Sequence, residues 1–221
     1  MLQANGLSKT FQRGKHIIPA VQNISLTLAP GQITSVVGRS GSGKSTLLNM
    51  LAGLLAPSSG QVTLDGQDLY TLSDFELSRL RNQSIGYIPQ GQTALPNLTV
   101  LQNLLLPLGL FPEKTDYQDR AEELLKLVGI AHLTDAKPAT LSGGELRRLA
   151  VARAMIRKPQ VILADEPTSN LDEENTSTVI SLLRNAADQG AAVLLVTHEL
   201  DTLQSADTIF RMENGILKCQ E

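Results

Sequence analysis

The first third of the chain alternates apolar and polar residues in short runs. NISLTL (residues 23–28) alternates strictly, which predicts a strand with one buried face. ITSVV (33–37) is a more continuous apolar run that leads directly into a glycine-rich loop. The run LLNMLAGLL behind that loop has helical character and stops at PSSG (57–60), and QVTLDG then predicts another short strand. This part of the chain therefore predicts strands and one helix.

The middle of the chain is mostly helical in pattern, and the last third alternates strand and helix again. SDFELSRLRN, with Ser73 or Asp74 as N-cap, YQDRAEELLKLVGI and the stretch at 140–155 predict helices. VILADE and AAVLLVTHE are apolar runs on either side of a predicted helix, and they suit parallel strands buried on both faces. TIFRMENGILK predicts a closing hairpin on an Asn214–Gly215 turn.

This order of elements predicts the fold class α/β, with a three-layer core and a helical insert. We expect a single domain over residues 1–221, with its core at about 1–80 and 160–221 and a helical subdomain at about 90–158. The composition, 42% hydrophobic and 19% charged residues, is ordinary for a globular protein with a sizeable core.

Net charge and cysteine content narrow the class of protein. The net charge of −3 argues against binding to nucleic acid through bulk positive charge, so no nucleic-acid partner is expected. Cys219 is the only cysteine, which excludes an internal disulfide and fits a reducing compartment. The first residues show no basic stretch followed by an apolar one, so the sequence indicates no secretion signal and predicts a cytoplasmic location.

Residues 82–112 contain no Lys, Arg, Asp or Glu. Proline, asparagine and glutamine interrupt the segment, so it does not supply the roughly 20 apolar residues of a membrane helix. Because it extends through what its sequence indicates as loop, where charges are normal, we expect another protein to cover it. The apolar residues at 95–106 would then form part of a groove for a short helix. The alternative is that the leucines at 104–106 belong to the core.

GRSGSGKST (38–46) satisfies the phosphate-loop pattern G-x-x-x-x-G-K-[ST], with a predicted strand before it and a helix after it. Glycines let the backbone wrap closely, so that consecutive N–H groups and the helix dipole face phosphate groups. Lys44 would reach the β- and γ-phosphates, and the Ser45 hydroxyl would hold Mg²⁺. The plainer alternative, a glycine-rich loop without a nucleotide, is the weaker explanation of a complete pattern in the required context.

VILADEP places Asp165 and Glu166 at the end of a predicted strand, the edge where ligands of open α/β sheets collect. An aspartate there can hold Mg²⁺, and an adjacent carboxylate can orient or deprotonate an attacking water. Such a pair alone is usually a helix cap or a solvent-exposed charge, and the phosphate loop reverses that judgement. His198 ends another apolar strand near the loop, whereas His16 and His132 have no such context.

A second glycine-rich helix start lies in TLSGGELRR. Ser142 and Glu145 stand in the S-x-x-E relation of a capping box, which by itself would explain Ser142. It does not explain Gly143 and Gly144, because glycine is a poor helix former. Two glycines at a helix start suit an anion that approaches the backbone, so the chain carries two candidate phosphate-binding helix starts.

Together these motifs resemble those of the ATP-binding cassette ATPases, the nucleotide-binding subunits of ABC transporters, over nearly the whole chain and in the family's order. Residues 38–46 look like the Walker A loop, Gln90 in GYIPQ the Q-loop, and LSGGE the signature. VILADE looks like Walker B, SNLD (169–172) the D-loop and His198 the switch histidine, while Phe11 matches the aromatic that stacks on adenine. The implied fold is a P-loop NTPase core of mixed sheet flanked by helices, with N-terminal antiparallel strands and a helical subdomain.

The resemblance implies a complete site. Its catalytic residues would be Glu166, His198 and Gln90. Mg²⁺ would be held by Ser45, Gln90 and Asp165. The residues that would bind ATP come from four parts of the chain: Phe11, Gly38, Arg39, Ser40, Gly41, Ser42, Gly43, Lys44, Ser45, Thr46, Ser142, Gly143, Gly144 and Asp172.

The resemblance also implies an assembly. In this family two cassettes pack head to tail, and each ATP lies between the Walker A loop of one and the signature of the other. An ATP-dependent homodimer would therefore use both glycine-rich helix starts. The second implied partner is a separately encoded integral membrane permease, which would place the protein peripherally on the inner face of the cell membrane.

Departures from the family pattern bear on side-chain contacts and on the subgroup. Phe11 replaces the commoner tyrosine but keeps a stacking face, and Arg147 stands where many members have glutamine. The region around Gln102 resembles the lipoprotein-release, macrolide-export and cell-division cassettes, where glutamate is usual at that position.

The resemblance leaves two functions open: an ATPase that powers an exporter or extractor, or a non-transport cassette that drives a membrane regulator of cell-wall hydrolysis. Soluble cassettes that act on DNA or ribosomes usually carry two cassettes or a long insertion, and this chain has one of each motif.

Overall fold

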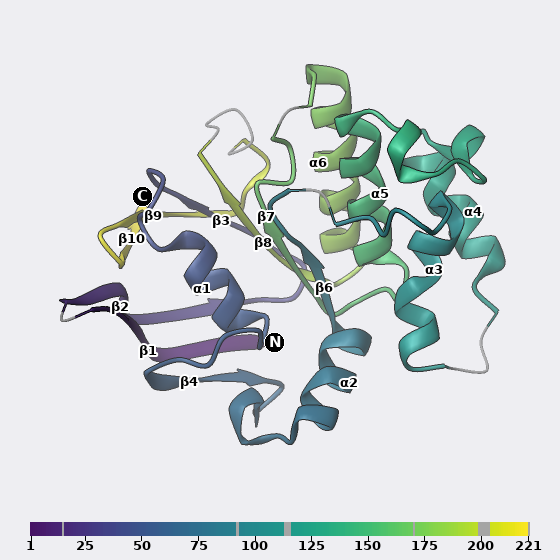
Figure 1. The fold of residues 1–221 in the computed structure, drawn as a ribbon. Helices are drawn as coiled ribbons and strands as arrows, with labels where there is room; N and C mark the ends of the chain where they lie inside the picture. Colours follow the sequence, from purple (N-terminus) through teal and green to yellow (C-terminus); the bar gives the residue numbers. More distant parts are fainter. Residues whose placement is uncertain (15, 92, 113–115, 170, 199–203, 221) are drawn as a thin grey trace.

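The computed structural model describes residues 1–14, 16–91, 93–112, 116–169, 171–198 and 204–220, and Figure 1 shows how they are arranged. Helix α1 (Lys44–Leu51) lies between two β-sheets. The other side of the larger sheet is covered by helices from the second half of the chain (Figure 1). The predicted fold class, a mixed α/β core with an N-terminal antiparallel sheet, is confirmed.

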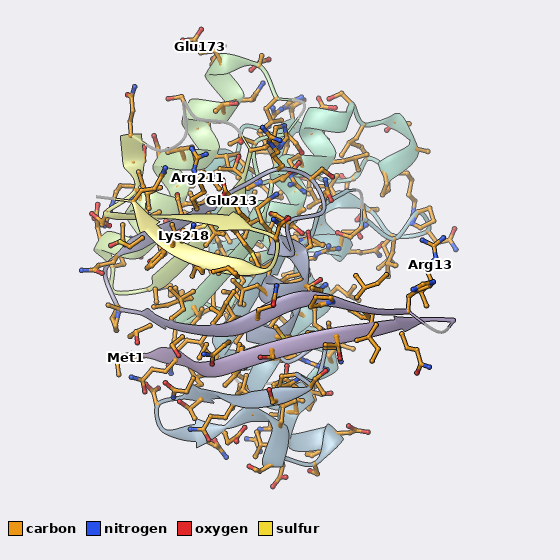
Figure 2. The ribbon with its side chains drawn as sticks, turned by 90° about the vertical axis from the view of Figure 1, so that its left-hand side faces the viewer. Met1, Arg13, Glu173, Arg211, Glu213 and Lys218 are labelled. Carbon is orange, nitrogen blue, oxygen red and sulfur yellow. The ribbon has the colours of Figure 1, made fainter. Side chains whose placement is uncertain are left out.

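The smaller sheet is antiparallel in the order β2-β1-β4-β5: β1 (Leu2–Arg13), β2 (His16–Leu28), β4 (Ser59–Leu64) and β5 (Gln67–Asp68). The predicted strand at 23–28 is the end of β2. Strand β1 was not predicted, because its pairing shifts register between Ala4 and Leu7, around Gly6, and the bulge breaks the alternation of side chains. Figure 2 shows Arg13 at one end of the β1–β2 hairpin and Met1 at the other end of the sheet.

The larger sheet has the order β10-β9-β3-β8-β7-β6, and all its neighbouring strands are parallel except β9 and β10. Its strands are β3 (Ile33–Val37), β6 (Ile85–Ile88), β7 (Val161–Asp165), β8 (Ala192–Thr197), β9 (Thr208–Glu213) and β10 (Ile216–Gln220). The predicted strands β3, β7 and β8 and the closing hairpin are therefore confirmed. Strand β6 was not predicted, since four residues that include Gly86 give little pattern.

Side chains of the central strands point alternately into two hydrophobic cores. Leu163 and Leu194 pack with α1 and the antiparallel sheet, whereas Ile162 and Val193 pack with the helices on the other side. The prediction that these strands are buried on both faces is confirmed.

The remaining helices are α2 (Asp74–Ser84), α3 (Val100–Leu110), α4 (Gln118–Leu127), α5 (Gly143–Met155) and α6 (Glu173–Asp188), with short 3₁₀ turns at Leu69–Thr71, Ala131–Leu133 and Pro138–Thr140. Ser73, rather than Asp74, is the N-cap of α2 and forms a capping box with Glu76. Within the described ranges, no helix combines the length and the apolar character needed to cross a bilayer.

The uncharged segment at 82–112 is only partly loop. Its last third is α3, which begins at the Thr99–Gln102 capping box, so the part of the segment that its sequence indicates as loop lies before this helix. Leu104 is fully buried in the core between the larger sheet and the helices, as the alternative interpretation of these leucines required, whereas Leu110 is 65% exposed.

Strand β6 lies, in the sequence, between the expected core and the expected helical subdomain. It pairs with β7, so it belongs to the core sheet. The division into core and helical subdomain otherwise stays a prediction.

Candidate functional site

The glycine-rich loop connects β3 to α1 and lies against backbone from two other strands. A Cβ atom at Gly43 would stand 2.1 Å from the carbonyl oxygen of Ala20, and one at Gly38 would stand 2.3 Å from that of Met212. Gly43 also has a φ of 106°, a left-handed conformation that glycine adopts without strain. Side chains at these two positions would force the loop away from the sheet, so the glycines fix its position.

Lys44 curls back into this loop. Its Nζ donates to the carbonyl oxygens of Gly38 at 2.7 Å and Arg39 at 3.0 Å, and the side chain is buried. Burial lowers the pKa of Lys44, while the charges of Glu166 and Asp165 raise it. The ammonium therefore lies where phosphate groups would replace the two carbonyls as acceptors.

The loop also holds a polar atom that lacks a partner. The Ser42 side chain is buried, and its Oγ has no hydrogen-bond partner among the described residues. Buried hydroxyls in native proteins are normally paired, so an acceptor from outside the chain would complete this loop. A phosphate oxygen has the required chemistry. The residues present therefore fit the polyphosphate of a nucleotide.

Asp165, at the end of β7, is 4% exposed and accepts a hydrogen bond from the Ser45 side chain. Burial raises the pKa of Asp165, while that hydrogen bond and the charges of Lys44 and Arg147 act in the opposite direction. A hydroxyl and a carboxylate side by side are oxygen ligands of the kind Mg²⁺ prefers when it also binds substrate phosphates. These two residues fit the predicted metal site.

The three predicted catalytic side chains lie together, and Glu166 contacts the other two, His198 and Gln90. Its Oε1 lies 2.8 Å from His198 Nδ1, and its Oε2 accepts from Gln90 Nε2 at 3.2 Å. The three residues follow β7, β8 and β6, whose parallel carboxyl ends meet at one edge of the sheet. Glu166 itself has a φ of 50°, in the left-handed region, and its N–H donates to Val196 O at 2.8 Å.

The second glycine-rich helix start caps α5. Glu145 N–H donates to Ser142 Oγ at 3.3 Å, and the Glu145 carboxylate accepts from Ser142 N–H at 2.7 Å, so the capping box is present. These bonds from Ser142 lower the pKa of Glu145. A Cβ atom at Gly143 would meet nothing within 4 Å, and one at Gly144 would lie 3.4 Å from Leu171. The fold itself therefore gives no reason for glycine at Gly143.

The remaining candidate ligands lie on β1, at the start of α6 and at the tip of the phosphate loop. Phe11 on β1 is 42% exposed, and Lys9 Nζ lies over its ring at 5.7 Å from the ring centre. Asp172 is the N-cap of α6, where it accepts from Asn175 N–H at 2.8 Å. Arg39, Ser40 and Gly41 are exposed at the loop tip. Asn170, in the predicted D-loop, falls outside the described residues.

The structure does not bring the two glycine-rich helix starts together. Helix α1 packs in the core beside the antiparallel sheet, and α5 packs in the core on the other face of the larger sheet (Figure 1). One residue of the site was missed by sequence reasoning: Arg147 of α5, whose guanidinium reaches the backbone at Glu166. The only sequence signal was an arginine where the resembled family often has glutamine.

Comparison with known proteins decides the family. The model of the ABC transporter family matches residues 21–169, which is more than half of the chain. The chain belongs to the ABC transporter family. The predicted resemblance is thus confirmed, and membership of this ABC ATPase family implies ATP hydrolysis.

Solved structures agree with this cassette over its whole length. One is a dimeric post-hydrolysis state of the ATP-binding cassette MJ0796 bound to ADP and Pi, 33% identical with a TM-score of 0.92. Another is a dimeric structure of MJ0796, described as a bacterial ABC transporter cassette, 32% identical with a TM-score of 0.91. Both comparisons cover 100% of this chain and 99% of that chain. An ATP-binding subunit of an ABC transporter, 23% identical over 99% of this chain and 90% of that one, shares the fold with a TM-score of 0.84.

Proposed function

We propose that this cassette binds two ATP and Mg²⁺ in a head-to-tail homodimer and that its ATP hydrolysis powers a separately encoded membrane permease, an exporter or extractor. The observation that carries the hydrolytic part is the contact of Glu166 with both His198 and Gln90, next to the loop that buries Lys44. Titration with ATP, followed by a steady-state assay of phosphate release, tests this part directly.

The binding roles follow from the loop. The loop N–H groups, the Ser42 hydroxyl and Lys44 would hold the phosphates, and the partly exposed ring of Phe11 would stack on adenine. Ser45 and Asp165, with Gln90, would hold Mg²⁺, which neutralises phosphate charge and fixes the geometry of the transfer.

The chemical step would depend on how the Glu166 carboxylate is held. Gln90 donates to one carboxylate oxygen and the His198 ring contacts the other, so the group is fixed at both ends. Glu166 would take a proton from water as the water oxygen bonds to the γ-phosphorus, and the bond from that phosphorus to the bridging oxygen breaks to leave ADP and phosphate. Positioning of the base then contributes to the rate.

The dimer is supported by the signature helix. Ser142, Gly143 and Gly144 lie on a different layer from the phosphate loop, so a second chain would be needed to bring the two together. Gly143 lines open space in this chain, which a partner's phosphate could enter. The related MJ0796 cassette has been solved as a dimer, once with ADP and Pi.

Gly143→Asp is expected to lower ATP turnover by about tenfold or more and to abolish ATP-dependent dimerisation. A carboxylate at this position would face the phosphates of the partner's ATP, and repulsion of only about 1.4 kcal/mol corresponds to a factor of ten. The monomer should fold normally, because the Cβ enters open space and an acidic residue in the first turn stabilises a helix. Size-exclusion chromatography with and without ATP, together with the turnover assay, checks the prediction.

Gly143→Ala is the matched control. It adds a methyl group in the same open space without charge, and it should lose much less activity than the aspartate variant. ATP affinity of the dilute monomer should be the same in both. An aspartate variant that dimerises and hydrolyses ATP like the wild type would show that the signature helix is not part of the second site.

As the docking surface for the permease we propose a cavity that includes Leu106, at the end of the predicted groove at 95–106. A cavity of about 570 Å³ is bounded by α2, β6, the end of α3, the end of α5 with the residues that follow it, and the residues after α1. Its described lining includes Leu54 and Leu110, which are 51% and 65% exposed, together with Arg81, Arg153 and Arg157 and no carboxylate. This surface is complementary to a short helix with an apolar face and acidic residues, which we propose as the permease segment.

Leu110→Glu is expected to leave ATP turnover by the isolated cassette within about twofold of wild type and to abolish co-purification with a co-expressed permease. Leu110 is exposed in the isolated chain, but a buried, unpaired carboxylate in the complex would be costly. Leu127→Glu, at a 48% exposed leucine on α4 outside the cavity, is the control and should still co-purify. Retention of the permease by the Leu110 variant would place docking elsewhere.

Leu98 is less suitable for this test. It is half-buried and its carbonyl accepts from Asn103, so a charge at Leu98 would test the folding of its loop rather than the binding of the permease.

A further inference from the structure

Arg147, one turn into α5, makes a buried set of main-chain contacts. Its side chain is 6% exposed, and each guanidinium nitrogen donates to a carbonyl oxygen. Nε binds Pro167 O at 3.1 Å, and Nη1 binds Pro89 O at 2.6 Å. Nη2 binds Asp165 O at 2.7 Å and also Glu166 O. These acceptors lie on two loops, one that carries Glu166 and one that leads into Gln90.

The contacts surround a strained residue. Glu166 has a φ of 50°, a conformation that a residue with a Cβ adopts only when its surroundings hold it there. On one side its N–H is bound to Val196 O at 2.8 Å, and on the other Arg147 binds the carbonyls of Asp165, Glu166 and Pro167. The direction of the Glu166 side chain depends on this backbone conformation, so Arg147 contributes to aiming the carboxylate.

Arginine suits this place for reasons that glutamine does not share. A guanidinium has five N–H donors in a rigid plane, whereas a glutamine amide has two. Burial lowers the pKa of Arg147, while the charges of Asp165 and Glu166 raise it. Arg147 thus constrains the backbone of the Glu166 turn and places a positive charge against the carbonyl oxygens of that turn.

We propose that Arg147 is a positioning residue for hydrolysis, which acts by holding the Glu166 turn and the Pro89 end of the Q-loop in the geometry that joins Glu166 to Gln90 and His198. The inference rests on the proposed function of Glu166 as general base. Arg147 also lies on the helix whose first turn would meet the partner's ATP, so the same contacts link that helix to the base.

A double-mutant cycle separates positioning from a general role in folding. We would measure turnover for Arg147→Met and Arg147→Gln, each alone and combined with Glu166→Gln, with single-turnover assays for the slow variants. Arg147→Met, which has no donor, is expected to lower turnover by about 10- to 100-fold, and Arg147→Gln by about three- to tenfold. In the Glu166→Gln background either change should cost less than about twofold, because the base it positions is already absent.

Binding of ATP supplies the second readout. The contacts of Arg147 go to the Glu166 turn and to Pro89 rather than to the phosphate loop, so the dissociation constant of ATP should stay within about twofold. The matched control is Arg157→Met, because Arg157 also binds main-chain carbonyls, those of Pro107 and Phe111. Any loss of turnover in this control should be the same factor in both backgrounds.

Equal factors for Arg147 in the two backgrounds, or no loss in either variant, would overturn the inference. If the methionine variant does not fold, the glutamine variant keeps two donors and carries the same comparison. Absence of ATPase activity in the wild type would instead contradict the proposed function, so the two failures are distinguishable.

Discussion

Glu166→Gln is expected to preserve ATP binding and to lower turnover by about 10²- to 10⁴-fold, the usual contribution of a general base. The amide keeps the size of the side chain and an oxygen that can accept from Gln90, but it cannot take a proton. Since ATP then persists between the subunits, the variant should also form a stable dimer in ATP. Steady-state phosphate release and size-exclusion chromatography with ATP measure the two effects.

Glu173→Gln is the control for this substitution, because Glu173 is an exposed carboxylate in the first turn of α6 (Figure 2). It should hydrolyse ATP at close to the wild-type rate. Normal turnover by the Glu166 variant would transfer the role of base to another group, and His198, whose ring contacts Glu166, would be the first to examine. His198→Ala tests that alternative and is itself expected to be severely slowed, because Glu166 loses one of its two side-chain partners.

The parts of the fold that the sequence predicted are those whose signal is local. Strands β3, β7 and β8 are buried on both faces and read as apolar runs, and the phosphate loop has a fixed pattern of glycines. The meeting of Asp165, Glu166 and His198 followed from the rule that parallel strands end at one edge. These predictions required no knowledge of contacts between distant segments.

The parts that were missed depend on tertiary contacts or on a weaker signal. Gly86 in β6 is required because a Cβ there would stand 2.5 Å from the carbonyl oxygen of Ala154, which no sequence pattern reveals. The start of α3 was also missed, although the sequence carries a signal for it, because Thr99 and Gln102 form a capping box. The partners of Arg147 are main-chain carbonyls, which carry no residue signature, so its role could be inferred only from the structure.

Lys44→Ala is expected to weaken ATP binding by about 10²-fold or more. Charge-assisted hydrogen bonds contribute about 1.5–3 kcal/mol each, and the Lys44 ammonium would supply the main cation for the β- and γ-phosphates. The fold should be little affected, because the Gly38 and Arg39 carbonyls that Lys44 now binds lie in a loop whose position is fixed by Gly38 and Gly43. Titration with a fluorescent ATP analogue and a thermal melt of the nucleotide-free protein check the two statements.

Lys126→Ala is the control, because Lys126 is a 71% exposed lysine on α4 whose loss changes the net charge by the same amount. It should bind ATP like the wild type. An unchanged affinity in the Lys44 variant would mean that the phosphates are not held by this loop, and the buried Ser42 hydroxyl would then need another partner. A loss of affinity with an unchanged melting temperature would instead place the main cation of the phosphate site at Lys44. The unchanged melting temperature would show that the two contacts of the side chain within the loop contribute little to folding, so the lost affinity could be assigned to the lost charge.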